Sequence, residues 1–174
     1  MKRLKNIRRA RIGEYVDKYS QAVFAEREAP FDRNPLWSHK ADCAFPCATE
    51  NEINHKDAEQ LMANGVGLVA EGATMPSTPE AVAVFLERGI LYAPGKAANA
   101  GGVAVSGLEM AQNSMRLNWS RSEVDERLKM IMKGIHRVCL DAAEEYGKPG
   151  SYVVGANVVG FLKVVNAMLD QGLV

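Results

Sequence analysis

VGLVAEGATMPSTPEAVAVFLERGILYA, residues 66–93, holds two short apolar segments with a helix-like segment between them. Residues 66–70 and 90–93 are apolar without alternation, which is typical of parallel strands covered on both faces. Between them, Thr78 can cap a helix whose first position is Pro79, and Gly89 can end it. The stretch therefore predicts a strand, a helix and a second strand.

The same pattern extends towards the N-terminus. Residues 41–47 form another short apolar run, and residues 54–64 have helical periodicity closed by Gly65. The order predicts an α/β fold, with a partial Rossmann-like parallel sheet of about three strands and flanking helices. Because ligands collect at the carboxyl ends of such strands, we expect the segments 47–51, 71–78 and 94–102 to meet at one edge.

The remainder of the chain predicts a helical C-terminal part. Helices are expected over residues 101–115, 120–146 and 157–170. The second begins at Ser120 or Ser122, and Ser120 with Glu123 has the spacing of a capping box. We therefore expect two domains. Residues 1–100 form the C-terminal half of a dinucleotide-binding domain, and residues 101–174 form a helical hinge and C-terminal helices.

Composition and charge narrow the class of partner. The 174 residues are 47% hydrophobic and 24% charged, with no net charge, which is the balance of a soluble globular protein. We expect neither nucleic acid nor a membrane as partner, and we find no run of about 18 apolar residues that suggests a spanning segment. Three cysteines without a secretory signal favour reduced thiols and a cytoplasmic location.

Residues 2–20 combine an approximate helical stripe with a crowd of basic side chains. This pattern predicts a basic helix with two interpretations. One is a nucleic-acid arm or an organelle-targeting peptide. The other is a helix face turned to solvent or to a partner, which the neutral total charge and the acidic Glu14 and Asp17 favour.

Four potential zinc ligands lie in a short span of the sequence: His39, Cys43, Cys47 and His55. Zinc sites usually pair their ligands more tightly, as in C-x2-C with H-x3-5-H. We therefore expect no metal site here. Cys43 and Cys47 are interpreted as buried small apolar residues.

Residues 97–102, AANAGG, follow the last expected strand and lead into a helix. Small residues let a backbone approach a ligand closely, and the N–H groups at a helix start can meet an anion. Asn99 adds a side-chain amide with two donors and one acceptor. The loop could hold a carboxamide or a carboxylate, although a Gly-Gly turn before a helix is more often a matter of geometry alone.

Four segments are more informative as a set than singly: PCATENE (46–52), AEGATMPSTPEA (70–81), APGKAANAGGVAVSGLEM (93–110) and YVVGANVVGFLKV (152–164). In this order and at these separations they resemble the hexameric, mostly NADP-linked glutamate dehydrogenases. The resemblance implies interconversion of L-glutamate with 2-oxoglutarate and ammonia by hydride transfer to NADP, with NAD as the alternative cofactor. It also implies a homo-oligomer, hexameric in the complete enzymes.

The resemblance also implies roles for individual residues. Ala48 and Thr49 would line the adenosine–pyrophosphate side of the cofactor, and Asn99 would lie against the nicotinamide carboxamide. Val103 and Ser106 fall where the family contacts the distal carboxylate of the substrate. Thr74 stands where the family often has an asparagine near the nicotinamide ribose, so a hydroxyl keeps one donor and acceptor but loses the reach of an amide.

Other parts of the family pattern are missing from the chain. No GxGxxG follows a strand, so we do not expect the phosphate-binding half of the dinucleotide fold here. The resemblance places the substrate-binding and catalytic lysines and the proton-passing aspartate elsewhere, so we expect no catalytic residue in this chain. We interpret it as a truncated C-terminal portion that is inactive alone and self-associates through its exposed sheet edge. The alternative is a non-catalytic binding or interaction module derived from the same fold.

Overall fold

The computed structural model describes residues 6–9, 11, 13–22 and 34–172. The chain consists of two compact units, Met1–Asp32 and Arg33–Val174. The expected domain boundary after residue 100 stays a prediction. The described part of the first unit contains the short helix α2 (Glu14–Lys18). A continuous basic helix is wrong there, because Arg9 has a left-handed φ of 52° and residues 7–9 lie outside any helix. Residues 2–5, 10 and 12 of that expected helix lie outside the described residues.

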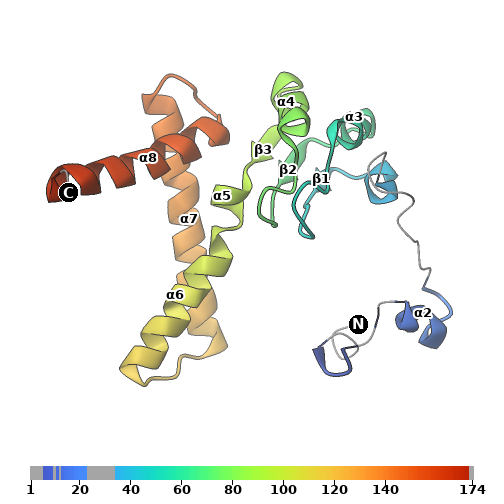
Figure 1. Ribbon diagram of the computed structural model, residues 1–174, viewed down its shortest axis with the longest axis horizontal. Coiled ribbons are helices and arrows are strands. Elements are labelled where there is room, and N and C mark those ends of the chain that lie inside the picture. Colours follow the sequence, from blue (N-terminus) through green and yellow to red (C-terminus); the bar gives the residue numbers. More distant parts are fainter. Residues whose placement is uncertain (1–5, 10, 12, 23–33, 173–174) are drawn as a thin grey trace. The chain divides into compact units, whose positions relative to one another are not determined.

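Three parallel strands form the sheet of the second unit, in the order β1 (Cys43–Ala44), β2 (Leu68–Ala70) and β3 (Leu91–Ala93) (Figure 1). In the register, Cys43 pairs with Leu68 and Leu68 pairs with Leu91. The predicted α/β fold with about three parallel strands is confirmed. The strands are shorter than the apolar runs that predicted them, because the runs continue into the turns on either side.

Helices α3 (His55–Ala63) and α4 (Pro79–Glu87) connect the strands and pack against each other. Asn54 begins α3 with a capping box, and Thr78 begins α4 by accepting a hydrogen bond from Ala81 N–H. Apolar side chains of both helices and of the strands form one buried core. The main buried members are Ala44, Ile53, Ala58, Leu61, Val69, Ala81, Val84, Phe85 and Tyr92.

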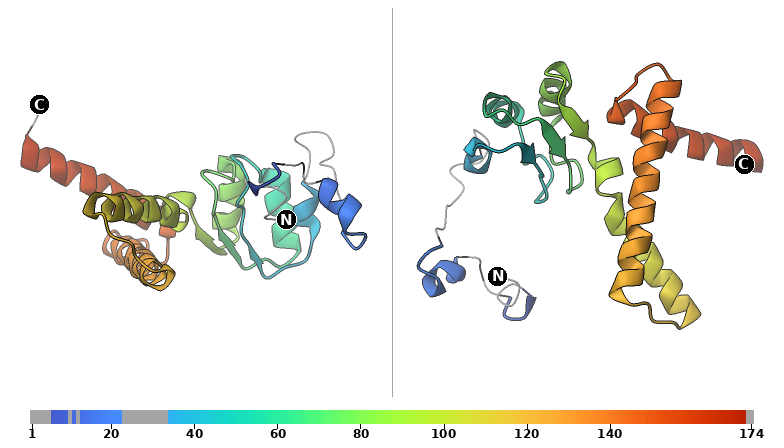
Figure 2. Two further views of the ribbon diagram at one scale, coloured as in Figure 1. Left: turned by 90° about the horizontal axis from the view of Figure 1, so that it is seen from below. Right: turned by 180° about the vertical axis from the view of Figure 1, so that it is seen from behind.

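The chain outside the sheet is helical. A 3-10 turn, η1 (Pro35–Ser38), precedes β1, and after β3 come α5 (Gly95–Ala98), α6 (Ala100–Met115), α7 (Arg121–Glu145) and α8 (Tyr152–Gln171). Helices α6 and α7 run side by side in opposite directions (Figure 2). The Ser120–Glu123 capping box is confirmed. Helix α8 begins at Tyr152 rather than at residue 157, because Ser151 accepts a hydrogen bond from Val154 N–H and caps the helix earlier.

Helix α8 crosses α7 where a glycine meets a backbone carbonyl. Gly155 is buried, and a Cβ atom added there would collide with the carbonyl oxygen of Cys139. Only glycine allows the two helix backbones to approach this closely. The residue that looks like a helix-weakening position in the sequence therefore sets the contact between α7 and α8.

Much of the surface of α8 is apolar. Phe161, Val164, Met168 and Leu169 are exposed, and only 11% of its most apolar 18-residue window is buried. Helix α8 has the length and mean composition of a membrane-spanning helix, although it contains no uninterrupted run of about 18 apolar residues. A helix that packs on other protein surface has the same composition, so this feature alone is weak support for a membrane.

Two cysteines differ from their expected environment. Cys43 and Cys47 are exposed and not buried: Cys43 lies on the opposite face of β1 from the buried Ala44, and Cys47 lies in the loop after the strand. Cys139, on α7, is buried, and burial raises the pKa of its thiol. All three cysteines are free.

Candidate cofactor groove

The loops that follow β1 and β2 meet at the carboxyl edge of the sheet. The N–H groups of Gly72 and Ala73 both donate to the carbonyl oxygen of Pro46, at 2.9 and 3.0 Å. Between the two loops lies a groove of about 520 Å³. Its lining residues are Cys47, Ala48, Thr49, Glu50, Gly72, Ala73 and Thr74. Three of the four expected cofactor residues, Ala48, Thr49 and Thr74, therefore line one groove.

Gly72 keeps the groove open. A Cβ atom added to it would collide with Sγ of Cys47, so no larger residue fits without moving that side chain. The absence of a side chain exposes backbone on the floor of the groove. This is the feature that lets a ligand approach the main chain closely.

A buried carboxylate shapes the first loop. Glu52 is 6% exposed, and its Oε1 accepts a hydrogen bond from the backbone N–H of Ala48 at 2.8 Å. The N–H of Ala48 is thus engaged within the protein and is not free to meet an anion. We did not single out Glu52 from the sequence, although an acidic residue soon after a buried strand was the signal for it.

Asn99 links the third loop to the groove. Its side-chain Nδ2 donates to the carbonyl oxygen of Ala73 at 3.1 Å and to Oγ1 of Thr74 at 3.4 Å. Its Oδ1 accepts no hydrogen bond within the described part of the chain. The fourth expected cofactor residue is therefore adjacent to Thr74 and to the wall of the groove, with one acceptor atom free.

A second buried carboxylate positions the helix that carries Asn99. Oε2 of Glu71 accepts a hydrogen bond from the N–H of Gly95, the first residue of α5, at 2.7 Å. The N–H of Asn99 in turn donates to the carbonyl oxygen of Gly95 at 2.8 Å. A Cβ atom on Gly95 would lie 2.8 Å from the carbonyl oxygen of Ala73, so the close approach of α5 to this loop requires glycine.

The two expected substrate residues lie elsewhere. Val103 and Ser106 are on α6, Val103 is 74% exposed, and the Ser106 hydroxyl donates to the carbonyl oxygen of Gly102 at 3.3 Å. Neither residue lines the groove. Their contact with a substrate carboxylate stays a prediction.

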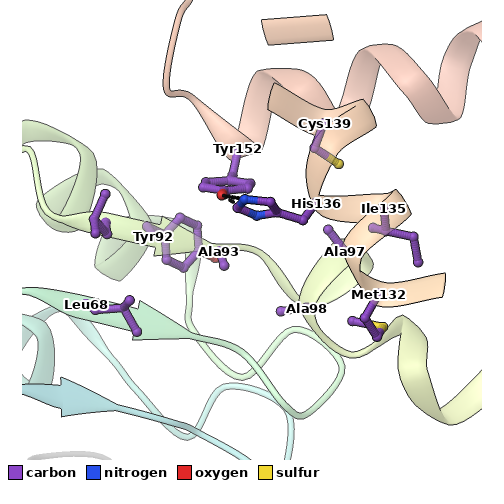
Figure 3. Close-up of a pocket in the computed structure, with 11 residues that line it drawn as sticks. Leu68, Tyr92, Ala93, Ala97, Ala98, Met132, Ile135, His136, Cys139 and Tyr152 are labelled. Carbon is purple, nitrogen blue, oxygen red and sulfur yellow. Dashed lines mark hydrogen bonds between the residues drawn. The ribbon is translucent and has the colours of Figure 1, made fainter. Parts of the chain in front are cut away.

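An apolar cavity of about 430 Å³ lies between the sheet and helices α5, α7 and α8 (Figure 3). Leu68 and Leu91 line its sheet side, and Met132, Ile135 and Cys139 line its α7 side. The hydroxyl of Tyr152 and Nδ1 of His136 share a hydrogen bond of 2.6 Å at its wall (Figure 3). None of the expected cofactor residues lines this cavity.

The possible zinc ligands do not form a metal centre in the part of the chain that the structure describes. There, no three His, Cys, Asp or Glu side chains lie close enough together to hold a metal ion. His55 instead lies 3.6 Å from Glu59, one helical turn along α3.

The family model of the Glutamate/Leucine/Phenylalanine/Valine dehydrogenases matches residues 1–172. The chain belongs to this dehydrogenase family. It is 56% identical to a glutamate dehydrogenase of Bacteroides thetaiotaomicron and 50% identical to an NADP-specific glutamate dehydrogenase of Giardia intestinalis. Each match covers 98% of this chain and 37% of the relative. Other relatives are named as NAD(P)-specific or NAD-specific enzymes.

Solved structures of the family have the same fold. A crystal structure of Plasmodium falciparum glutamate dehydrogenase matches with a TM-score of 0.88 and 44% identity. That match covers 99% of this chain and 36% of the Plasmodium chain. The family member described here thus spans little more than a third of the length of the relatives it matches.

Proposed function

We propose that this chain is the C-terminal portion of a glutamate dehydrogenase that interconverts L-glutamate with 2-oxoglutarate and ammonia. The cofactor is NADP, with NAD as the alternative. The observation that carries the proposal is the meeting of Ala48, Thr49 and Thr74 in one groove, with Asn99 hydrogen-bonded to its wall. The relatives named as glutamate dehydrogenases support the reaction.

The groove fits part of a dinucleotide. Its floor is made of small residues, and Gly72 leaves the space that a Cβ atom would fill. Ala48 and Thr49 would hold the adenosine–pyrophosphate side, and Thr74 would lie near the ribose of the nicotinamide. When bound, the nicotinamide ring supplies the hydride acceptor, and the protein supplies position and electrostatics.

Asn99 would orient the carboxamide by accepting a hydrogen bond. Both contacts of its Nδ2 are made within the protein, to Ala73 and Thr74, and Oδ1 remains free. A free amide oxygen accepts from an N–H2 group, which the carboxamide of a nicotinamide carries. Thr74 therefore acts partly through Asn99, because its Oγ1 accepts a hydrogen bond from the Asn99 side-chain amide. Val103 and Ser106, on α6, would contact the distal carboxylate of the substrate.

We place the catalytic residues outside this chain. No lysine lines the groove, and no GxGxxG precedes its strands. The segments 46–52, 70–81 and 93–110, which carry the family resemblance, follow the three strands in the order expected for the family. This order supports assignment of the chain to the C-terminal portion. The complete enzyme would be a homo-oligomer, and the free thiols support the cytoplasmic location. The 174-residue chain alone would not turn over.

A chimeric enzyme tests this function. Residues 1–172 of this chain would replace the matching part of the Bacteroides thetaiotaomicron enzyme, which is 56% identical to it. We expect the chimera to oxidise glutamate with NADP, and the 174-residue chain to give no rate above background. A chimera that assembles like the parent enzyme but has no activity would contradict the proposal. Glutamate oxidation by the 174-residue chain alone would contradict the proposal that the catalytic residues lie outside this chain.

A further inference from the structure

The apolar cavity between the sheet and helices α5, α7 and α8 has no part in the proposed cofactor site (Figure 3). All of its lining residues belong to the second compact unit. Its volume of about 430 Å³ lies in the range of about 300–1,000 Å³ that is typical of small-molecule sites. Such sites have mostly apolar and aromatic walls with few polar groups, and this cavity has the same character.

The walls of the cavity favour a neutral ligand. Among the described residues, no Asp, Glu, Lys or Arg lines it. Burial raises the pKa of Tyr92, Cys139 and Tyr152, so these three lining groups stay neutral at physiological pH. A charged ligand would lose its hydration here without gaining a counter-ion, which is costly. The phosphates of a dinucleotide therefore do not suit this cavity.

Rings and sulfur atoms on the walls favour an aromatic ligand. Tyr92 lies on the sheet side, and the rings of His136 and Tyr152, with centroids 5.4 Å apart, lie on the helix side (Figure 3). Met132 and Cys139 add two sulfur atoms from α7. Aromatic rings pair favourably with one another and with sulfur. An aromatic ring thus gains contacts here that an aliphatic ring of the same size lacks.

Water is a poor occupant of the same space. A buried water molecule usually needs roughly two to four hydrogen-bond partners, and apolar cavities stay dry and take up benzene. The hydroxyl of Tyr152 is already engaged with Nδ1 of His136 at 2.6 Å. Because His136 is exposed, the cavity is not sealed from solvent at this wall, and a ligand can enter there.

We propose that this apolar cavity binds a small neutral aromatic molecule. The ring lies among Tyr92, Met132 and Cys139. Its ligand is neither the cofactor nor the substrate of the proposed reaction. The proposal does not rest on the proposed function, because none of the expected cofactor or substrate residues lines the cavity.

Titrations of the 15N-labelled 174-residue chain with three probes of similar shape test the cavity. Benzyl alcohol is neutral and aromatic, benzoate is aromatic and charged, and cyclohexylmethanol is neutral and aliphatic. We expect benzyl alcohol to bind at least about tenfold more tightly than benzoate, because the charge loses its hydration. It should bind about threefold more tightly than cyclohexylmethanol, because it makes ring and sulfur contacts. Its binding should shift the amide signals of Ala93, Ala98 and Ile135.

Substitutions that fill the cavity test the location of the ligand. Met132→Trp adds volume on the α7 wall, so benzyl alcohol should bind at least about tenfold more weakly. Met130→Trp is the matched control on the same helix, because Met130 is 67% exposed and does not line the cavity. It should leave the affinity unchanged. Ala98→Leu fills the cavity from α5 and should weaken binding in the same way if Met132→Trp does not fold.

Four results would overturn the proposal. Benzoate could bind as tightly as benzyl alcohol, which would mean that His136 and not the apolar lining selects the ligand. The shifted amides could lie outside the cavity. Met132→Trp and Met130→Trp could change the affinity equally. No saturable binding could occur, which would mean that the cavity is closed to small molecules in solution.

Discussion

The side-chain amide of Asn99 donates a hydrogen bond to the carbonyl oxygen of Ala73, 3.1 Å away. These residues are 26 positions apart and belong to the loops after β3 and β2. The contact joins the start of α6 to the wall of the cofactor groove. It also fixes which atom of the amide, Oδ1, is left for a ligand.

Replacing Asn99 should therefore affect stability in a defined order. Asn99→Ala removes the donor and lowers the free energy of unfolding by about 1 kcal/mol. Asn99→Asp lowers it more, by about 2 kcal/mol, because a carboxylate oxygen then faces the carbonyl oxygen of Ala73. Urea denaturation at neutral pH measures both values. An aspartate variant as stable as the unsubstituted chain would show that the contact does not form.

Gly155 should not tolerate a methyl group. Gly155→Ala pushes a Cβ atom into the carbonyl oxygen of Cys139, so we expect it to lower the free energy of unfolding by about 3 kcal/mol and to separate α7 from α8. Gly160→Ala is the matched control on the same helix, because its added Cβ meets open space. It should stabilise the chain by about 0.5–1 kcal/mol. Equal effects of the two substitutions in thermal denaturation would contradict the close crossing.

The start of α7 should give a pH dependence. Hydrogen bonds to the backbone and side chain of Ser120 lower the pKa of Glu123 below its ordinary value of about 4.5. A lowered pKa stabilises the folded state above the unfolded value, and this stabilisation is lost as the pH falls through the folded pKa. The stability difference between the unsubstituted chain and Glu123→Gln should be constant above about pH 5.5 and shrink below 4.5. A difference that grows as the pH falls would contradict the capping geometry.

The three cysteines should react at two distinct rates. Cys43 and Cys47 are exposed, whereas Cys139 is buried and burial raises its pKa. Because the thiolate is the reactive form, iodoacetamide should label the first two quickly and Cys139 only when the chain unfolds. Mass spectrometry after brief labelling measures this. Rapid labelling of Cys139 under native conditions would mean that the contact between α7 and α8 opens.

The sheet could be predicted from local patterns. Three short apolar runs, the first two followed by a turn and a helix cap such as Thr78, predict the strands and their parallel order. The site could be placed for the same reason, since parallel strands bring their carboxyl ends together. Ala48, Thr49 and Thr74 consequently line one groove, with Asn99 beside them.

Other features depend on contacts between distant segments. Glu71 and Glu52 are buried where they accept hydrogen bonds from the N–H groups of Gly95 and Ala48, respectively. No sequence pattern predicts either contact. Helix α8 starts five residues earlier than expected because Ser151 caps it. Cys43 is exposed because its face of β1 is uncovered, whereas an apolar strand sequence alone predicts burial on both faces.

An NADPH titration of the 15N-labelled chain, followed through its amide signals, tests the central claim most directly. The cofactor groove predicts weak binding, with a dissociation constant on the order of 1 mM, and shifts at Ala48, Thr49, Thr74 and Asn99. Shifts that cluster around Met132 and Ile135 in the apolar cavity, or no shift at several times that concentration, would contradict the assignment of the cofactor to the groove.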